Sequence, residues 1–188
     1  MIAIKKNGIV YFCESYCNSH YLSTTDDFIK YEENRHVIRD KNLPHRLIMC
    51  DAPLRAVDLI RYGGVFPKRL TPQNLLRQTY PSIVPLLGPY GFLNDDDACT
   101  FDFLFAKGDK CYAVRGGGVI DEVEEFYPFC YAKHAAIAEY MRSKDLPIMS
   151  LVWRIYTTIE KSTTRIQFPV VVMNTGNDEV TVIRREER

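Results

Sequence analysis

The chain has 188 residues, of which 46% are hydrophobic and 26% charged, and its 24 Lys and Arg balance its 24 Asp and Glu. This length and composition suit one globular domain with its own core, which we expect to span residues 1–188. A net charge of zero argues against a nucleic-acid-binding protein, because such proteins usually carry a basic excess. The chain shows neither a signal-peptide pattern nor an apolar run long enough to span a membrane, so we expect a cytoplasmic protein.

The six cysteines are spread along the chain with no Cys-x-x-Cys pair. Structural zinc sites favour closely paired ligands, and the four histidines show no metal spacing either, so we expect no metal and no other cofactor. In the absence of a signal peptide, the thiols are expected to be reduced. Three of them lie within apolar strands and are expected in the core: Cys13, Cys50 and Cys111.

The chain opens on two apolar runs that flank Asn7-Gly8. Asn and Gly accept the positive φ angles of a type I′ turn, so this pair predicts a hairpin. The second run, Ile9 to Cys13, is apolar without alternation, which is typical of a strand covered on both faces. The polar stretch from Ser15 to Asp27 predicts a loop.

Two more strands are predicted at His36 to Asp40 and His45 to Cys50, on either side of a turn signal around Pro44. Asp51 then suits a helix N-cap, because its side chain can accept a hydrogen bond from a free backbone N–H of the first turn. The apolar periodicity of this helix ends at Gly63-Gly64, which predicts its C-terminus.

A second helix is predicted to begin at Thr71-Pro72, a cap followed by a proline in the first turn. Pro81 and Pro85 fall further along the same helical pattern. Proline lacks a backbone N–H and clashes with the preceding turn, so we expect a kink or break there.

The loop from Tyr90 to Ala98 contains Asp95-Asp96-Asp97. It lacks the alternate spacing and the distal Glu of an EF-hand, so we interpret it as a solvated turn. About three strands follow between Phe101 and Tyr127, and the first two form a hairpin that turns at Gly108-Asp109. Gly116 to Gly118 precedes a strand-like run and not a helix N-terminus, so we interpret it as a turn or bulge, not a phosphate loop.

Two helices are predicted in the second half of the chain. Phe129 to Ser143 is rich in alanine, which lets a helix lie close to a sheet or to another helix. The next helix has the clearest periodicity in the chain, with apolar residues at i, i+3, i+4 and i+7: Ile148, Leu151, Val152, Ile155, Tyr156 and Ile159. A last hairpin is predicted from Ile166 to Ile183, with its turn at Asn174 to Asp178.

Strands and helices therefore come in blocks, which indicates an α+β fold and excludes a doubly wound parallel one. The sequence-local hairpins make the sheets mainly antiparallel. A four-layer αββα sandwich, in which two antiparallel sheets are flanked by helix pairs, uses every predicted element. We expect this architecture for the whole chain.

This order of elements resembles the proteasome β-type subunits and the bacterial HslV peptidase, both of the N-terminal-nucleophile (Ntn) hydrolase superfamily. The matching features are the opening hairpin with Lys6 to Val10, the strand pair that leads into Cys50-Asp51-Ala52, the stretch Phe101 to Tyr127, and the helix Phe129 to Tyr140. The resemblance implies the αββα fold. It also implies a homo-oligomer, either a dimer or a ring, that packs through its helical layers. A further protein partner is compatible with this resemblance.

In that family, a free N-terminal Thr, Ser or Cys attacks a carbonyl and its own α-amino group serves as the base. When the Asn7-Gly8 turn is aligned on the family hairpin, the nucleophile falls a few residues before Met1. Ile2 has no nucleophilic atom, so removal of Met1 would not supply one. We therefore expect a divergent member that lacks the N-terminal nucleophile, unless the natural chain starts upstream.

Other positions of the family site differ as well. Glu14, or Ser15 if the register slips by one, stands where the family has an aspartate. Arg35 falls near the family lysine and keeps its positive charge, but it cannot deprotonate. Cys130 falls near the serine of a Gly-Ser-Gly turn, with neither glycine present. Met1, Glu14, Arg35 and Cys130 are therefore the candidate residues of a remnant site, to which we assign no catalytic role.

The sequence leaves three functions open. The one we favour is a pseudoenzyme of proteasome-like fold that acts as an assembly or binding module. The second is a peptidase or amidohydrolase of the same fold that uses an upstream nucleophile or an internal thiol, such as Cys17 near His20 or Cys130 near His134. The third is a small-ligand binder that uses the cleft of the remnant site.

Overall fold

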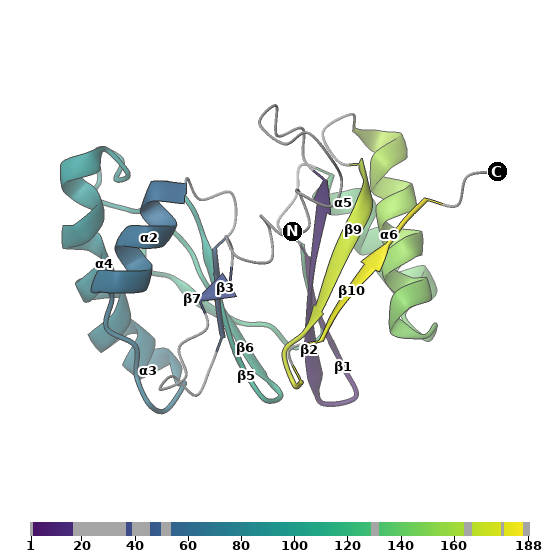
Figure 1. Ribbon diagram of the computed structural model, residues 1–188, viewed down its shortest axis with the longest axis horizontal. Coiled ribbons are helices and arrows are strands. Elements are labelled where there is room, and N and C mark those ends of the chain that lie inside the picture. Colours follow the sequence, from purple (N-terminus) through teal and green to yellow (C-terminus); the bar gives the residue numbers. More distant parts are fainter. Residues whose placement is uncertain are drawn as a thin grey trace. The chain divides into compact units, whose positions relative to one another are not determined.

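The computed structural model describes residues 2–16, 37–38, 46–49, 54–128, 132–163, 167–177 and 179–185. The chain divides into two compact units (Figure 1). Unit 1 comprises Met1–Lys30 and Glu124–Arg188, and unit 2 is the continuous segment Tyr31–Val123. Unit 2 is thus inserted into unit 1, so the core of unit 1 forms only when the two ends of the chain come together.

Unit 1 contains a five-stranded sheet in the order β10-β9-β2-β1-β8, and the pairings described in it are antiparallel. Its strands are β1 (Ile2–Lys6), β2 (Ile9–Tyr16), β8 (Phe126–Pro128), β9 (Gln167–Asn174) and β10 (Val180–Ile183). The opening hairpin lies in the middle of this sheet, between strands from the far end of the chain. The prediction that the run from Ile9 to Cys13 is covered on both faces is confirmed, because its consecutive residues Phe12 and Cys13 are both buried. Ile2, Ala3 and Ile4 of β1 are buried as well.

The turn of the opening hairpin is confirmed. Asn7 and Gly8 have φ angles of 53° and 74°, the left-handed conformation that a type I′ turn requires at both central positions. The loop predicted from Ser15 starts too early, because β2 continues to Tyr16 by pairing with β9, with a register shift between Ser15 and Tyr16. This pairing joins residues far apart in the chain, so the local polar composition gave no signal of it. The rest of the predicted loop lies outside the described residues.

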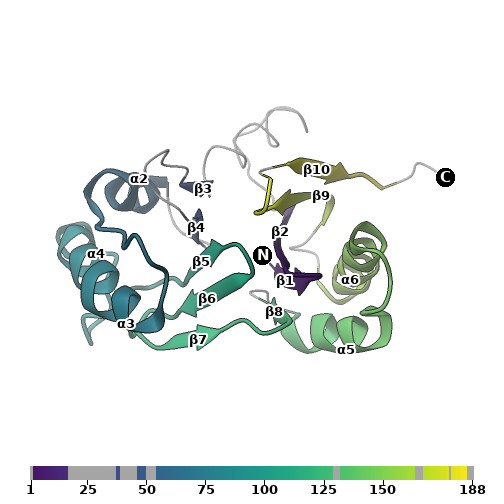
Figure 2. The same cartoon turned by 90° about the horizontal axis from the view of Figure 1, so that it is seen from below.

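Helices α5 (Lys133–Ser143) and α6 (Ile148–Ser162) lie side by side on one face of this sheet (Figure 2). Of the six residues of the predicted apolar stripe, Leu151 to Ile159 are buried and Ile148 is half-buried, so the prediction of α6 is confirmed. The stripe packs on side chains of β1 and β2, including Ile2, Ile4 and Cys13. The preceding helix begins at Lys133 among the described residues, and the predicted start at Phe129 lies outside them.

Unit 2 contains a second five-stranded sheet, in the order β3-β4-β5-β6-β7, again with antiparallel pairings. Its strands are β3 (Val37–Ile38), β4 (Arg46–Met49), β5 (Phe103–Lys107), β6 (Lys110–Val114) and β7 (Ile120–Glu122). The hairpin that turns at Gly108-Asp109 is confirmed, and Gly108 has a φ of 60°. The three glycines form a turn between β6 and β7, where the Gly118 N–H donates to the Arg115 carbonyl at 2.8 Å.

Between Phe101 and Pro128 the structure has four strands where about three were predicted. The additional strand is β8, which has only three residues and pairs with β1 in the sheet of unit 1. A strand this short has no recognisable alternation of its own, and its partner lies at the other end of the chain. No local pattern could therefore reveal it.

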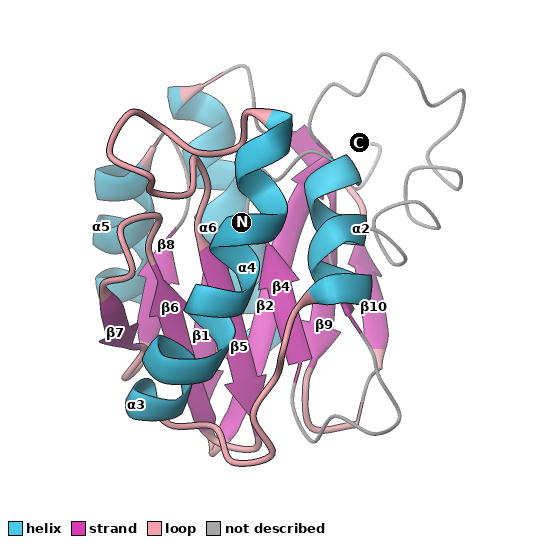
Figure 3. Cartoon of the chain, turned by 90° about the vertical axis from the view of Figure 1, so that its left-hand side faces the viewer, coloured by secondary structure: helices cyan, strands magenta, loops and turns pink. Residues whose placement is uncertain are grey.

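The helices of unit 2 are α2 (Leu54–Gly63), α3 (Pro72–Asn74) and α4 (Tyr80–Leu87), with a π-helical turn η1 (Leu75–Thr79) and a 3₁₀ turn η2 (Gly88–Tyr90). Figure 3 shows α2 and α4 in front of the strands of their sheet. The predicted end of α2 is confirmed: the Gly64 N–H donates to the Ile60 carbonyl at 2.9 Å. A Cβ on Gly64 would lie 2.7 Å from that same oxygen, so this position requires glycine. The predicted cap Asp51 lies outside the described residues.

Of the predicted kink or break at the prolines, the break is wrong, because the helical run from Pro72 continues through Pro81 and Pro85 to Leu87. The irregularity lies just before them, in η1, where the Tyr80 N–H reaches back five residues to the Leu75 carbonyl. A π turn widens the helix by one residue. The wider turn changes the position of the carbonyls that the ring of Pro81 would otherwise meet, so the chain accommodates the proline without leaving the helix.

The predicted fold class is confirmed: the protein is α+β, with two antiparallel sheets and helices packed on each. Each unit has its own apolar cluster between its sheet and its helices. Within the described residues, no helix combines the length and the apolar character needed to cross a bilayer.

Candidate functional site

The sequence predicts a remnant site at the start of β1, and in the described residues Ile2 pairs there with Cys13 of β2 and with Pro128 of β8. Ile2 and Cys13 are buried in the cluster beneath α5 and α6. Side chains alternate along a strand, so the side chain of Glu14 lies on the face of the sheet turned away from these helices. The described part of this strand end is thus apolar on one face and carries a carboxylate on the other.

Cys13 is a core residue, as predicted. It is a fully buried free thiol, and this burial raises its pKa, which keeps the thiol protonated at neutral pH. The Tyr156 hydroxyl of α6 donates a hydrogen bond to the Cys13 carbonyl at 2.7 Å. This bond joins the helix to the centre of the sheet, so Cys13 contributes to packing and has no nucleophilic thiolate.

Glu14 and Ser15 are the two alternative positions of the family aspartate, and both are described. Glu14 is half-buried, and its Oε1 accepts the backbone N–H of Ser15 at 3.1 Å. Ser15 is buried and pairs with Val170 of β9, while Glu14 pairs with Val171. Glu14 is therefore the residue of the two that can supply a negative charge at this end of β2.

The other three candidates, Met1, Arg35 and Cys130, lie outside the described residues. Their convergence with Glu14 stays a prediction. The Cys17 and His20 pair also lies outside the described residues, as does Cys50. His134 is exposed near the start of α5.

A second group of titratable side chains lies in unit 2, around Cys99 and Tyr80. Burial raises the pKa of both the Cys99 thiol and the Tyr80 hydroxyl, so both are protonated at neutral pH. The Tyr80 hydroxyl donates to the Gly116 carbonyl, which also accepts the Cys99 N–H at 3.0 Å. A Cβ on Gly116 would overlap the Cys99 carbonyl. These contacts hold the glycine turn against α4 and do not suit acid–base chemistry. Cys111 is likewise buried, as predicted.

The described residues contain no group of three or more His, Cys, Asp or Glu side chains placed to hold a metal ion. The loop of three aspartates is a turn organised by Asn94, whose Oδ1 accepts the N–H groups of Asp96 and Ala98 at 3.0 and 2.9 Å. All three aspartates are exposed. The interpretation as a solvated turn is confirmed.

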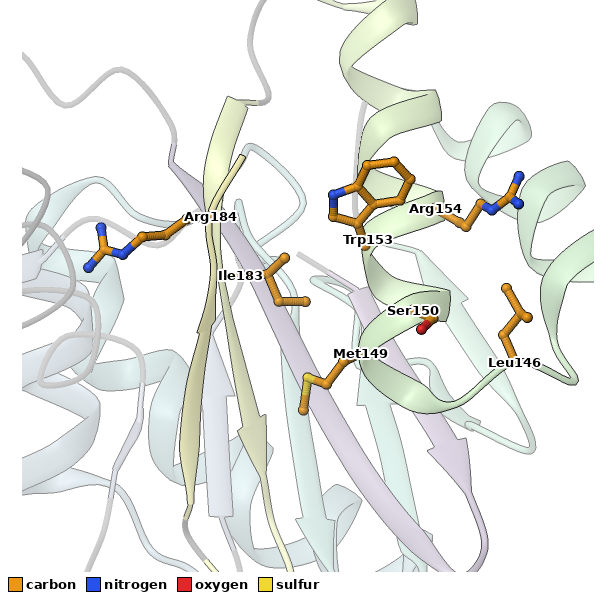
Figure 4. A pocket seen from close by; sticks show the side chains of 7 residues that line it. All are labelled: Leu146, Met149, Ser150, Trp153, Arg154, Ile183 and Arg184. Atoms are coloured by element: carbon orange, nitrogen blue, oxygen red, sulfur yellow. The ribbon is translucent and has the colours of Figure 1, made fainter. Parts of the chain in front are cut away.

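A pocket of about 570 Å³ lies within unit 1, between the exposed side of α6 and the end of β10 (Figure 4). Its volume falls in the range of small-molecule sites. The residues that line it are Leu146, Met149, Ser150, Trp153, Arg154, Ile183 and Arg184. Sequence reasoning missed this pocket. The available signal was Trp153, which stands outside the apolar stripe of α6 and therefore had to face away from the core.

No protein-family model matches the chain, and no curated protein matches it. The fold, with two antiparallel sheets, helices on each and a central opening hairpin, is that of the proteasome-like Ntn hydrolases. Solved structures of this class match almost the whole chain.

Three of these structures illustrate the similarity. Thiobacillus denitrificans BPH in complex with epoxomicin is 14% identical, with a TM-score of 0.66 and coverage of 97% of both chains. The helical assembly of the Anbu complex from Pseudomonas aeruginosa is 10% identical, with a TM-score of 0.64, and the match covers 99% of this chain and 87% of that one. HslV from Trypanosoma brucei is 9% identical, with a TM-score of 0.54 and coverage of 98% of both chains. Similarity at these identities establishes the fold alone.

Proposed function

We propose that this protein is a proteasome-like assembly or binding module of the cytoplasm that lacks the family's peptidase activity. The observation that carries the proposal is the exposure of large apolar side chains on the helices of both units. Met141 on α5 is 62% exposed, Leu76 in η1 is 51% exposed, and Tyr62 on α2 is 82% exposed. Each of these side chains exposes apolar surface that a partner could cover.

The arrangement on α5 supports an interface. Ala136 and Tyr140 face the core, whereas Ile137 and Met141, four residues apart, share an exposed flank of the helix, about a quarter turn away. Ile137 is 37% exposed and Met141 is 62% exposed. A second copy of the chain would cover this flank, in line with the homo-oligomer that the resemblance implies and with the helical assembly solved for the related Anbu fold.

The proposed loss of peptidase activity rests on the changed residues of the family site. By the resemblance, Glu14 or Ser15 falls at the position of the family aspartate, Arg35 falls near the lysine, and Cys130 falls near the serine. At the described end of β1, Cys13 is a buried and protonated thiol. These changes alter the charged and hydroxyl groups that, in the family, surround and activate the N-terminal nucleophile.

Assembly is tested by light scattering coupled to size-exclusion chromatography across a range of protein concentrations. We expect a wild-type oligomer, and we expect Met141→Glu or Leu76→Glu to reduce its mass, because a buried unpaired carboxylate is costly. Val119→Glu is the matched control, since Val119 is 56% exposed on the glycine turn and not on a helix. A wild-type protein that stays monomeric, or helix variants that assemble like the control, would contradict self-assembly.

The absence of peptidase chemistry is tested with epoxomicin, because one structural neighbour has been solved in complex with it. We expect no covalent mass increase after incubation with this compound and no hydrolysis of fluorogenic peptides. Stable labelling would favour the alternative, a peptidase or amidohydrolase of the same fold. Cys17→Ala, Cys130→Ala and a chain with additional upstream residues would then locate the nucleophile.

A further inference from the structure

We propose that the outer edge of β10 pairs with the same edge of a second copy of this chain, so that two sheets join into one across an antiparallel dimer contact. The proposal rests on the assembly function proposed above and assigns it a contact separate from the exposed side chains of the helices. In the described sheet of unit 1, β10 is an end strand, paired with β9 on its inner side (Figure 2). The outer side of such a strand presents backbone groups that another strand can bind.

The pairing with β9 shows which backbone groups of β10 point outward. The Asn174 N–H donates to the Glu179 carbonyl at 2.9 Å, which directs the backbone of Glu179 toward β9. The direction alternates along an antiparallel strand, so Val180 and Val182 direct their N–H and C=O groups to the outer edge. The four residues of β10 are all β-branched, and they include neither the lysine nor the proline that protects many edge strands.

Charge complementarity selects a second copy of the chain as the partner. Glu179 and Arg185 stand three residues before and three residues after Val182. When Val182 lies opposite the partner's Val182 about a two-fold axis, each Glu179 therefore lies opposite the partner's Arg185. Opposite charges placed directly across two strands stabilise their pairing, and the symmetric contact contains this pair twice.

The two charged side chains lie on the same face of the sheet and are accessible. Ile183 packs against the cluster beneath α5 and α6, and side chains alternate along a strand, so Glu179 and Arg185 lie on the helix side as well. The ion pair of Arg185 with Glu160 of α6, at 3.4 Å, agrees with this placement. The side chain of Arg185 is 70% exposed and Glu179 is exposed. A guanidinium has five N–H donors, so Arg185 can bind Glu160 and the partner's carboxylate together.

Val182→Pro tests the backbone contact. It removes an N–H that points outward, so the pairing of β10 with β9 is kept. We expect light scattering coupled to size-exclusion chromatography to show half the wild-type mass or less, whereas Val182→Thr, which keeps the N–H, should assemble as wild type. A wild type that assembles together with an equally assembled Val182→Pro variant would refute the β10 contact and leave assembly through the helices standing. A monomeric wild type would contradict both proposals.

Charge reversal tests the partner and the register without removing a backbone group. Glu179→Arg and Arg185→Glu each place like charges across the contact, and each is expected to raise the dissociation constant about tenfold or more. The double variant restores both pairs and should regain most of the affinity. This recovery cannot come from Glu160, because the double variant also lacks the contact between Arg185 and Glu160. Unchanged affinity in the single variants, or a double variant as weak as the singles, would overturn the proposal.

Discussion

At the residue scale, Glu139 is a buried charged side chain that needs hydrogen-bond partners within the fold. It is 4% exposed on α5, and it accepts hydrogen bonds from the Ser143 hydroxyl at 2.7 Å, from the Thr158 hydroxyl of α6 at 3.3 Å, and from Arg142 at 3.1 Å. The hydrogen bond from Ser143 is the largest cause of its lowered pKa, which burial opposes and Thr158, Arg142 and Arg154 support. The ionised carboxylate therefore joins α5 to α6.

Glu139→Gln is expected to lower the free energy of unfolding by about 1–3 kcal/mol, because the variant loses charge-assisted hydrogen bonds in a buried place. Since the folded pKa lies below the ordinary value of 4.5, the stabilisation is complete above pH 4.5 and is lost as the pH falls through the lowered folded pKa. Urea unfolding at several pH values should show a difference between wild type and variant that is constant near neutral pH and shrinks in acid. Glu124→Gln, at an exposed position, should show no such difference. A pH-independent loss would assign Glu139 a packing role only.

At the scale of elements, the helical run from α3 through η1 to α4 includes two prolines, which weaken its backbone hydrogen bonding. The N-cap of this run is therefore expected to matter for its stability. Thr71 is the N-cap, and its hydroxyl accepts the Asn74 N–H at 3.2 Å. We expect Thr71→Ala to cost about 1 kcal/mol of unfolding free energy, whereas Thr71→Ser keeps the acceptor and most of the stability. The shift in urea midpoint measures both. Equal midpoints for the Ala and Ser variants would show that the helix start is held by packing and not by this hydrogen bond.

At the scale of the whole molecule, the insertion of unit 2 into unit 1 predicts cooperative unfolding, as expected for a single domain of residues 1–188. Trp153 emission reports on unit 1, and thiol labelling of Cys99 and Cys111, read by mass spectrometry, reports on unit 2. We expect the two probes to give the same urea midpoint. Separate midpoints would instead define two domains that unfold independently.

Much of the secondary structure was predictable because its causes are local. The Asn7-Gly8 turn, the hairpin at Gly108, the end of α2 at Gly64 and the apolar stripe of α6 each follow from backbone conformation or side-chain periodicity within a few residues. The blocks of strands and helices then sufficed to predict an α+β fold with antiparallel sheets. For the candidate site, the sequence named Glu14 and correctly assigned Cys13 to the core.

The remaining features required the tertiary structure, because they depend on partners far along the chain. The extension of β2 to Tyr16 and the short strand β8 exist only through pairing with β9 and β1. The helical run continues past Pro81 because a π turn precedes it, and no local sequence pattern predicts that turn. The pocket at Trp153 arises where α6 and β10 meet. The sequence by itself determined which segments become strands and helices and which side of α6 is buried; the tertiary structure decided which strands are neighbours, and therefore which side chains share a surface.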